Sequence, residues 1–172
     1  GLMAAAVESD DPVVFIEHKG LLLTRAEDFP FGSDVPAERY VVPIGVAAIV
    51  REGTDVTVAT LSQTVLSAYS AAEELAAEGI SVELIDLRSV VPLDTATVAR
   101  SVQKTGRLLV IDEDYQSFGL SAEIITRVFE SGVTPISFAR HAVPDVPIPG
   151  ALSLEQGVVP QTSSIREEIR KV

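Results

Sequence analysis

The sequence contains no cysteine among its 172 residues. This absence excludes disulfide bonds, thiolate metal sites and a cysteine nucleophile, and it fits a reducing compartment. The two histidines, His18 and His141, lie far apart, and neither has a second histidine at ligand spacing, so a zinc site is not expected. The motifs G-x-G-x-x-G, G-x-x-x-x-G-K-[ST] and G-x-S-x-G are also absent. The sequence therefore lacks the usual motifs of dinucleotide-binding proteins, P-loop nucleoside triphosphatases and serine hydrolases.

Long apolar runs and positive charge are scarce as well. The longest nearly apolar run, residues 41–50, is about half of the ~20 residues that a spanning helix needs, so no membrane association is expected. The first residues, GLMAAAVESDD, have no basic region and no cleavage site, which predicts that the protein is not secreted. The formal net charge is −12, from 13 basic and 25 acidic residues. Nucleic-acid binding is therefore not expected, and a basic protein partner is favoured.

Hydrophobic periodicity predicts alternating strands and helices along most of the chain. Residues 1–9 are predicted to form a helix, residues 13–17 a buried strand, and residues 18–39 a linker. Beyond residue 40, strands are expected at 46–50, 55–61, 80–87, 107–112 and 136–140. Helices are expected at 63–78, between the cap Asp94 and Gly106, at 120–131, and after a capping box formed by Ser164 and Glu167. This alternation predicts an α/β fold with an open, mostly parallel sheet and helices on both faces.

Three consecutive acids, Asp112, Glu113 and Asp114, follow the predicted strand 107–112. One interpretation is a carboxylate cluster that binds a divalent cation, or a single acid with a raised pKa. The alternative is a polar strand end that is solvated. Strand geometry sends Asp112 and Asp114 to one side and Glu113 to the other, and no further ligand lies nearby in sequence. The solvated strand end is therefore favoured, and each acid is expected to be dispensable for folding.

A second segment with several charged residues, DLRSVVPLD, spans residues 86–94. It allows an anion site built from Arg88 and the N-terminus of the following helix. It also allows an ion pair between Asp86 and Arg88 that orders the loop. Because Asp94 is expected to cap the helix, the ion pair is favoured.

Several motifs occur in an order that resembles a known family: PVVFIEHK, PIGVAAIVREGTDVTVAT, EGISVELIDLRSVVPLD, SVQKTGRLLVIDE, FGLSAEI and VPDVPIP. Together they resemble the C-terminal half of the beta subunit of thiamin-diphosphate-dependent 2-oxo acid dehydrogenases, the pyruvate, branched-chain and acetoin type. The resemblance implies a five-stranded transketolase C-terminal-type domain over residues 40–172. It also implies that residues 1–17 are the last helix and strand of a pyrimidine-binding domain, and that 18–39 form the linker.

In that family the intact heterotetramer decarboxylates a 2-oxo acid with thiamin diphosphate and magnesium and transfers the acyl group to lipoamide. The glutamate that activates the cofactor, the histidine near the substrate and the G-D-G…N diphosphate motif have no match in this sequence. The resemblance therefore implies no catalytic and no cofactor-binding residue in this chain. It implies an assembly role, with an alpha subunit, a second beta subunit and the basic binding domain of the dihydrolipoyl acyltransferase as partners.

The resemblance also supplies candidate site residues. The FGLSAEI region lies near subunit contacts in the family, which makes Phe118, Gly119, Leu120 and Glu123 interface candidates, and the chain alone is expected to form a dimer or larger oligomer. A potassium site is expected at Ala6, Val7, Ser9 and Asp11, although Ser9 stands where some members carry an acid. The location implied is the bacterial cytoplasm or an organelle matrix. A stand-alone, flavodoxin-like module that binds a small ligand or a protein without catalysis is the alternative.

Overall fold

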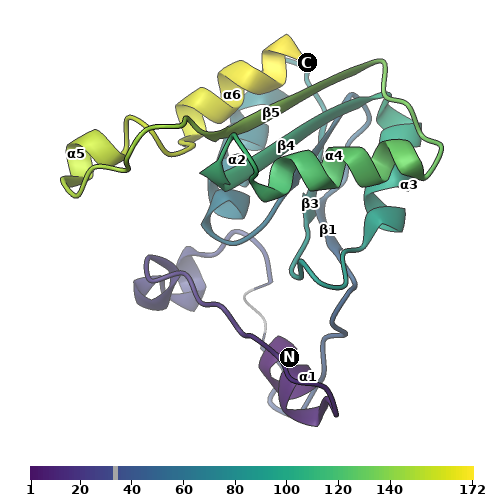
Figure 1. Cartoon of the computed structure of the whole chain (residues 1–172), viewed down its shortest axis with the longest axis vertical. Coiled ribbons are helices and arrows are strands. Elements are labelled where there is room, and N and C mark those ends of the chain that lie inside the picture. Colours follow the sequence, from purple (N-terminus) through teal and green to yellow (C-terminus); the bar gives the residue numbers. More distant parts are fainter. Residues whose placement is uncertain (33–34) are drawn as a thin grey trace.

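A five-stranded sheet forms the centre of the fold (Figure 1) in a computed structural model that describes residues 1–32 and 35–172. The strands are β1 (Ala48–Arg51), β2 (Val56–Thr60), β3 (Val82–Asp86), β4 (Arg107–Tyr115) and β5 (Ser137–Val143), in the spatial order β1-β3-β2-β4-β5. All neighbours pair in parallel except β1, which runs antiparallel to β3 at one edge. The open, mostly parallel sheet predicted from the alternation of elements is confirmed.

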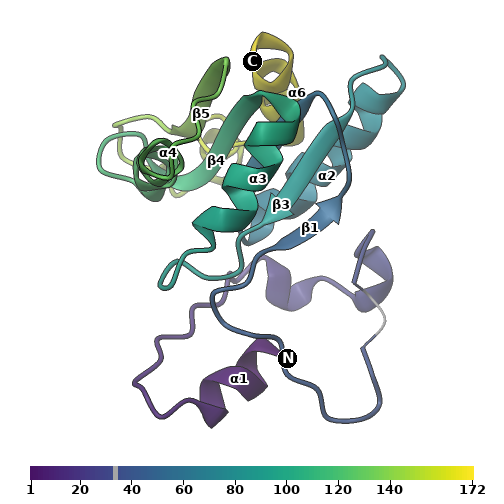
Figure 2. The same ribbon diagram turned by 90° about the vertical axis from the view of Figure 1, so that its right-hand side faces the viewer.

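Helices cover both faces of the sheet (Figure 2). One face packs against α2 (Gln63–Ala76) and α6 (Thr162–Lys171), and the other against α3 (Thr95–Thr105) and α4 (Leu120–Glu130). Strand alternation divides the core accordingly. In β4, Leu109 and Ile111 join the α2/α6 layer, while Leu108 and Val110 join the α3/α4 layer. Each of these four side chains is fully buried, which stabilises the fold by roughly 1.5–3 kcal/mol per residue.

The ends of α3 follow the signals in the sequence. The Thr97 N–H donates to Asp94 Oδ1 at 3.0 Å, and the Ala47 N–H donates to Asp94 Oδ2 at 3.0 Å. Burial raises the pKa of Asp94, but these hydrogen bonds more than offset it, so the pKa lies below its usual value. Gly106 ends the helix with a φ of 73°, in the left-handed region that favours glycine.

Two details of the helices differ from the prediction. Helix α6 begins at Thr162, and its capping box is formed by Gln161 and Ser164, not by Ser164 and Glu167. The spacing of Phe129 from the buried Ile125, four residues earlier, favours an inward position, but Phe129 is 38% exposed and packs edge-on against Phe138 of β5, with ring centroids 5.4 Å apart. A short helix that the sequence did not indicate, α5 (Leu152–Glu155), precedes α6.

The N-terminal region lies below the sheet on extended loops (Figures 1 and 2). The predicted first helix is present as α1 (Leu2–Glu8) and buries none of its residues. The buried strand expected at residues 13–17 is wrong, because that segment has no strand structure and Val14 and Ile16 are each 86% exposed. Its β-branched composition favours a strand, but no strand of the described sheet runs beside it.

The predicted linker at residues 18–39 contains two short 3₁₀ turns, η1 (Leu21–Leu23) and η2 (Ala26–Asp28). Two of its residues, 33 and 34, lie outside the described part of the chain. The rings of Phe31 and Tyr69 pack 5.2 Å apart and join the linker to α2. The assignment of residues 1–17 to a preceding domain, with a boundary near residue 40, stays a prediction.

A buried charge lies between β3 and α3. Glu83 is 1% exposed, forms an ion pair with Lys104, and accepts a hydrogen bond of 3.3 Å from the Gly53 N–H. Burial raises the pKa of Glu83, but the hydrogen bonds more than offset it, so the pKa lies below its usual value. A Cβ on Gly53 would lie 2.1 Å from the Val82 carbonyl carbon. Only glycine therefore allows the chain to cross β3 so closely on its way from β1 to β2.

Candidate functional site

The acidic end of β4 is a helix cap. Asp112 is 5% exposed; its Oδ2 accepts a hydrogen bond from the Ser121 N–H at 3.0 Å, and its Oδ1 accepts one from the Asp114 N–H at 3.1 Å. The first bond satisfies a free donor in the first turn of α4. The prediction of a solvated strand end is therefore wrong for Asp112, because strand alternation gives the side on which a residue lies but not its depth.

Glu113 points away from this cap and lies close to the linker. Its Oε1 is 3.6 Å from His18 Nε2. Burial raises the pKa of the Glu113 carboxyl, and Asp112 and Glu155 raise it further, while His18 acts in the opposite direction. Within residues 1–32 and 35–172, no group of three or more His, Cys, Asp and Glu side chains is placed to hold a metal ion.

The turn between β4 and α4 presents one aromatic ring to solvent. Phe118 has a φ of 65° and a fully exposed side chain. The Ser117 N–H and Oγ donate to Asp145 at 3.2 and 2.6 Å, which ties the turn to the proline-rich loop. A Cβ on Gly119 would lie 2.1 Å from the Tyr115 carbonyl oxygen. The contacts of Ser117 and Gly119 hold the turn on both sides of Phe118. The backbone between them directs the Phe118 ring into solvent.

A groove of about 470 Å³ lies beside this ring and is lined by Tyr115, Ser117, Phe118, Asp145, Val146 and Pro147. The structure brings the four predicted interface residues into this region, but they differ in role. Phe118 and Glu123 reach the surface, and Glu123 accepts a hydrogen bond of 2.6 Å from Arg127 Nε. Gly119 is buried and Leu120 packs against the α3/α4 layer. The Ser117–Asp145 contact was missed, because the two residues lie 28 positions apart.

The predicted potassium residues form one short segment. Ala6 and Val7 are in the last turn of α1, and Ser9 and Asp11 follow it. The Asp11 N–H donates to Ser9 Oγ at 3.2 Å, and all but Ala6 are exposed. Potassium binding at this segment stays a prediction.

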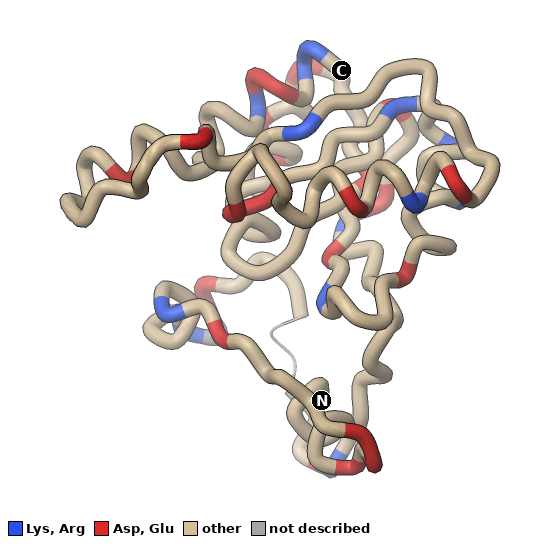
Figure 3. Tube along the Cα trace, viewed as in Figure 1, with Lys and Arg blue, Asp and Glu red and all other residues tan. Residues whose placement is uncertain are grey.

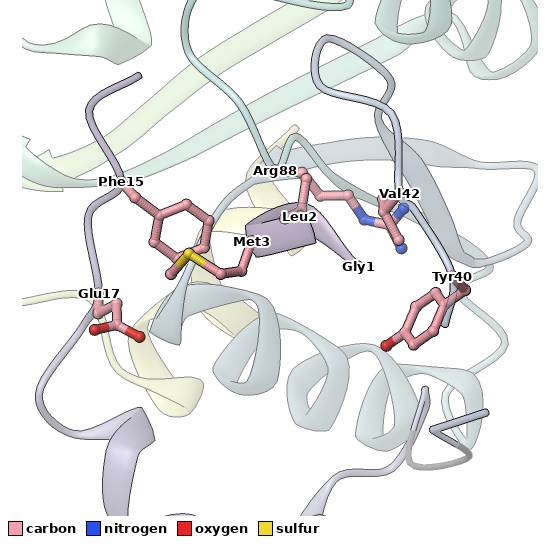
Figure 4. Close-up of a pocket in the computed structure, with 8 residues that line it drawn as sticks. All are labelled: Gly1, Leu2, Met3, Phe15, Glu17, Tyr40, Val42 and Arg88. Atoms are coloured by element: carbon pink, nitrogen blue, oxygen red, sulfur yellow. The ribbon is translucent and has the colours of Figure 1, made fainter. Parts of the chain in front are cut away.

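A second concave region lies at the carboxyl end of β3 (Figure 4). It is a pocket of about 370 Å³ between α1, the residues just before and just after the linker, and the loop after β3, and its lining includes Phe15, Glu17, Tyr40 and Arg88. The Arg88 N–H donates to Asp86 Oδ1 at 3.1 Å, and Arg88 Nε lies 3.7 Å from Asp86 Oδ2. The expected Asp86–Arg88 pair is therefore present. Burial raises the pKa of Asp86, and Arg88 opposes that effect.

Charged positions occur on most elements of the trace (Figure 3). The exposed faces of α2 and α6 are joined by two ion pairs, Arg166–Glu74 and Arg170–Glu78. The hydrogen bond from Arg170 holds the pKa of Glu78 below its usual value, and the charges of Arg170 and Arg166 act in the same direction. The surface is thus acidic in sum but carries basic residues on the α6 side.

The sequence profile described as "Transketolase, C-terminal domain" matches residues 45–165. The chain belongs to this family. The resemblance given by the sequence motifs is confirmed, and the matched residues include all five strands.

Curated relatives extend the similarity over almost the whole chain. The mitochondrial pyruvate dehydrogenase E1 component subunit beta-1 of Arabidopsis thaliana is 44% identical, over 96% of this chain and 45% of that protein. The pyruvate dehydrogenase E1 component subunit beta of Bacillus subtilis is 36% identical, over 100% of this chain and 51% of that protein. The acetoin:2,6-dichlorophenolindophenol oxidoreductase subunit beta of Cupriavidus necator is 36% identical, over 99% and 49%. The chain thus spans about half the length of these relatives.

A solved structure shares the fold. It is titled "Split gene transketolase, inactive beta4 tetramer", has a TM-score of 0.69 and 25% sequence identity, and covers 82% of this chain and 45% of that chain. The transketolase C-terminal type of fold, expected from the motifs, is thereby confirmed.

Proposed function

We propose that this chain is the C-terminal assembly domain of the beta subunit of a thiamin-diphosphate-dependent 2-oxo acid dehydrogenase. The observation that carries the proposal is the 36–44% identity to pyruvate dehydrogenase and acetoin oxidoreductase beta subunits over nearly the whole chain. In the intact enzyme, thiamin diphosphate and magnesium would supply the chemistry of oxidative decarboxylation. The sequence has no G-D-G…N motif to hold the diphosphate, so the cofactor does not fit the residues of this chain.

The role of the domain is then to hold subunits together. Phe118 and the adjoining groove form one contact surface, for which the second beta subunit is the proposed partner. The split-gene transketolase that shares the fold is an inactive beta4 tetramer, which is consistent with contacts between beta chains. The alpha subunit and the basic binding domain of the acyltransferase are the other proposed partners, the latter favoured by the net charge of −12.

The N-terminal region supports the assembly role through its exposed apolar side chains. Met3, Val7, Val14 and Ile16 are 49%, 78%, 86% and 86% exposed. Exposed apolar groups of this number in one short region favour association. Their proposed partner is the remainder of the intact beta subunit, since the relatives are about twice as long as this chain.

A chimera tests the proposal directly. The matching half of the Bacillus subtilis beta subunit is replaced by this chain and co-expressed with the alpha subunit of the same complex. We expect the chimera to form the heterooligomer and to decarboxylate pyruvate with transfer of the acyl group to lipoamide. A chimera that folds but does not bind the alpha subunit would contradict the assembly role. It would favour the alternative, a stand-alone binding module.

Isolated, the chain is expected to have no decarboxylase activity and no affinity for thiamin diphosphate. Calorimetry with thiamin diphosphate and magnesium measures this, and saturable binding near micromolar would contradict the assignment. Potassium is proposed to bind at Ala6, Val7, Ser9 and Asp11. Thermal unfolding in KCl against NaCl at equal ionic strength tests it in the assembled chimera, where potassium should raise the melting temperature.

The proposed location is the bacterial cytoplasm or an organelle matrix. Four of the matched plant proteins and one from Drosophila melanogaster are named as mitochondrial, and others are bacterial. In residues 1–32 and 35–172, none of the helices has both the length and the apolar character to span a bilayer. Fractionation of the source cells, with detection of the intact subunit, measures the location.

A further inference from the structure

His141 of β5 joins the sheet to the first turn of α6. Its Nε2 lies 2.8 Å from Ser164 Oγ, and its ring is half-buried on the face of the sheet that α6 covers. Ser164 Oγ also accepts a hydrogen bond from the Gln161 N–H and donates one to the Gln161 carbonyl, both at 3.0 Å, in the capping box of α6. A neutral imidazole that donates from Nε2 completes this set, because the Ser164 oxygen accepts two hydrogen bonds. His141 is thus part of the cap of α6.

Among the residues whose positions are described, two charged groups act on His141, and both are on α6. They are Glu168 and Lys171, which pair with each other at 2.6 Å. β4 places the apolar Ile111 beside His141, and strand alternation directs Arg140 to the other face of the sheet. The carboxylates of α2 that meet α6 pair with arginines, Glu74 with Arg166 and Glu78 with Arg170. Burial holds the pKa of His141 below its usual value; the charge of Glu168 opposes this effect, and that of Lys171 adds to it.

Side-chain contacts hold α6 against the rest of the domain. Ile165 and Ile169 are buried in the core between α6, α2 and the sheet, and the two ion pairs to α2 lie at the surface. In the part of the chain that the structure describes, no backbone hydrogen bond joins α6 to a strand, whereas neighbouring strands share a main-chain ladder. Elements held in this way open at a lower free-energy cost than the strands of a core sheet. Detachment of α6 therefore does not require the sheet to unfold.

We propose that α6 is a pH-sensitive element of this fold: protonation of His141 favours detachment of α6 while the sheet stays folded. Docked α6 keeps water from part of the ring, which penalises the charged form, and detachment hydrates it. The neutral ring therefore stabilises the docked state. That stability is lost as the pH falls below about 6.5, the usual value for histidine, and through the lower pKa of the docked state. All of these contacts lie within residues 63–172, so the detachment depends neither on the region before residue 40 nor on the assembly role proposed above.

Hydrogen exchange of the full chain at about pH 7.5 and about pH 5.5 tests this, with each rate corrected for the intrinsic exchange rate at that pH. Amides of α6 should be less protected than those of β4 at both pH values. Their protection should fall by about threefold or more at the lower pH. His141→Gln keeps a side-chain N–H donor for Ser164 but does not titrate, so this fall should disappear. His18→Gln is the matched control, because it removes the other histidine of the sequence and should keep the fall.

Equal protection of α6 and β4 would overturn the proposal, because α6 would then open only with the whole domain. So would an unaltered chain without the fall, or a fall that persists in His141→Gln, since other groups would then cause it. If His141→Gln does not fold, NMR titration of the His141 ring in the unaltered chain decides, with His18→Gln to assign the signal. The pKa of His141 should lie below about 6.5, and a value at or above it would contradict the proposal.

Discussion

Replacement of Asp112 by alanine removes a buried carboxylate that binds two backbone N–H groups, those of Ser121 and Asp114. Loss of an N-cap side chain typically costs about 0.5–2 kcal/mol, and each buried donor left without a partner costs about 1–3 kcal/mol. Because Asp114 is exposed, water replaces one of the two bonds. We therefore expect Asp112→Ala to lower the free energy of unfolding by about 2 kcal/mol. That loss corresponds to a melting temperature lower by about 4–8 °C.

The matched control is Asp114→Ala, in the same acidic run but exposed to solvent. It should change the free energy of unfolding by less than about 0.5 kcal/mol. Urea unfolding followed by circular dichroism measures both variants, and Asp112→Asn should fall between them because its amide keeps one acceptor oxygen. Equal effects of the two alanine variants would refute the helix-cap interpretation. A rise of several degrees in melting temperature with calcium or magnesium would restore the metal interpretation of this strand end.

Three further predictions address the rest of the molecule. Gly119→Ala should lower the free energy of unfolding by about 1–3 kcal/mol, because the added Cβ would lie 2.1 Å from the Tyr115 carbonyl oxygen. The control is Gly150→Ala, which should be near neutral in the same urea unfolding assay because no atom lies within 4 Å of its added Cβ. Phe118→Ser should leave stability within about 0.5 kcal/mol and weaken self-association in light scattering; a monomeric unaltered chain would contradict this. Burial lowers the pKa of His141, so the unfolded chain binds more protons below about pH 6.5, and stability should fall as the pH drops through that value. His141→Asn should reduce this slope.

The sequence predicted the elements whose signals are local. The apolar periodicity gave all five strands of the sheet and the four long helices, and Asp94 and Gly106 marked the ends of α3 correctly. The strand predicted at residues 13–17 is absent because a strand forms only beside another strand. The composition of the segment does not show whether such a neighbour is present. The sequence did not predict that β1 runs antiparallel to β3 either, because the direction of β1 depends on how the chain crosses β3 at Gly53.

The candidate site was predicted less completely than the fold. The Asp86–Arg88 pair was expected because its members lie two positions apart, and it is present. The pocket around Arg88 was not expected, since its other walls come from residues 1–42, far away in sequence. The role of Asp112 was missed for another reason: Ser121 is only nine residues away, but the conformation of the turn after β4, which brings it to the carboxylate, is not evident from the sequence.

The buried Glu83 restricts which residues relatives of this protein can have at the positions around it. It lies on the α3 side of β3, between Val82 and Leu84, which face the α2/α6 layer. A shift of β3 by one residue would carry the carboxylate into an apolar layer away from Lys104, so this pair fixes the alignment of the strand. Loss of Lys104 leaves the buried Glu83 carboxylate without its counter-ion, whereas loss of Glu83 leaves the half-exposed Lys104 paired with Glu52. A relative that keeps the acid at position 83 is therefore expected to keep a base at position 104.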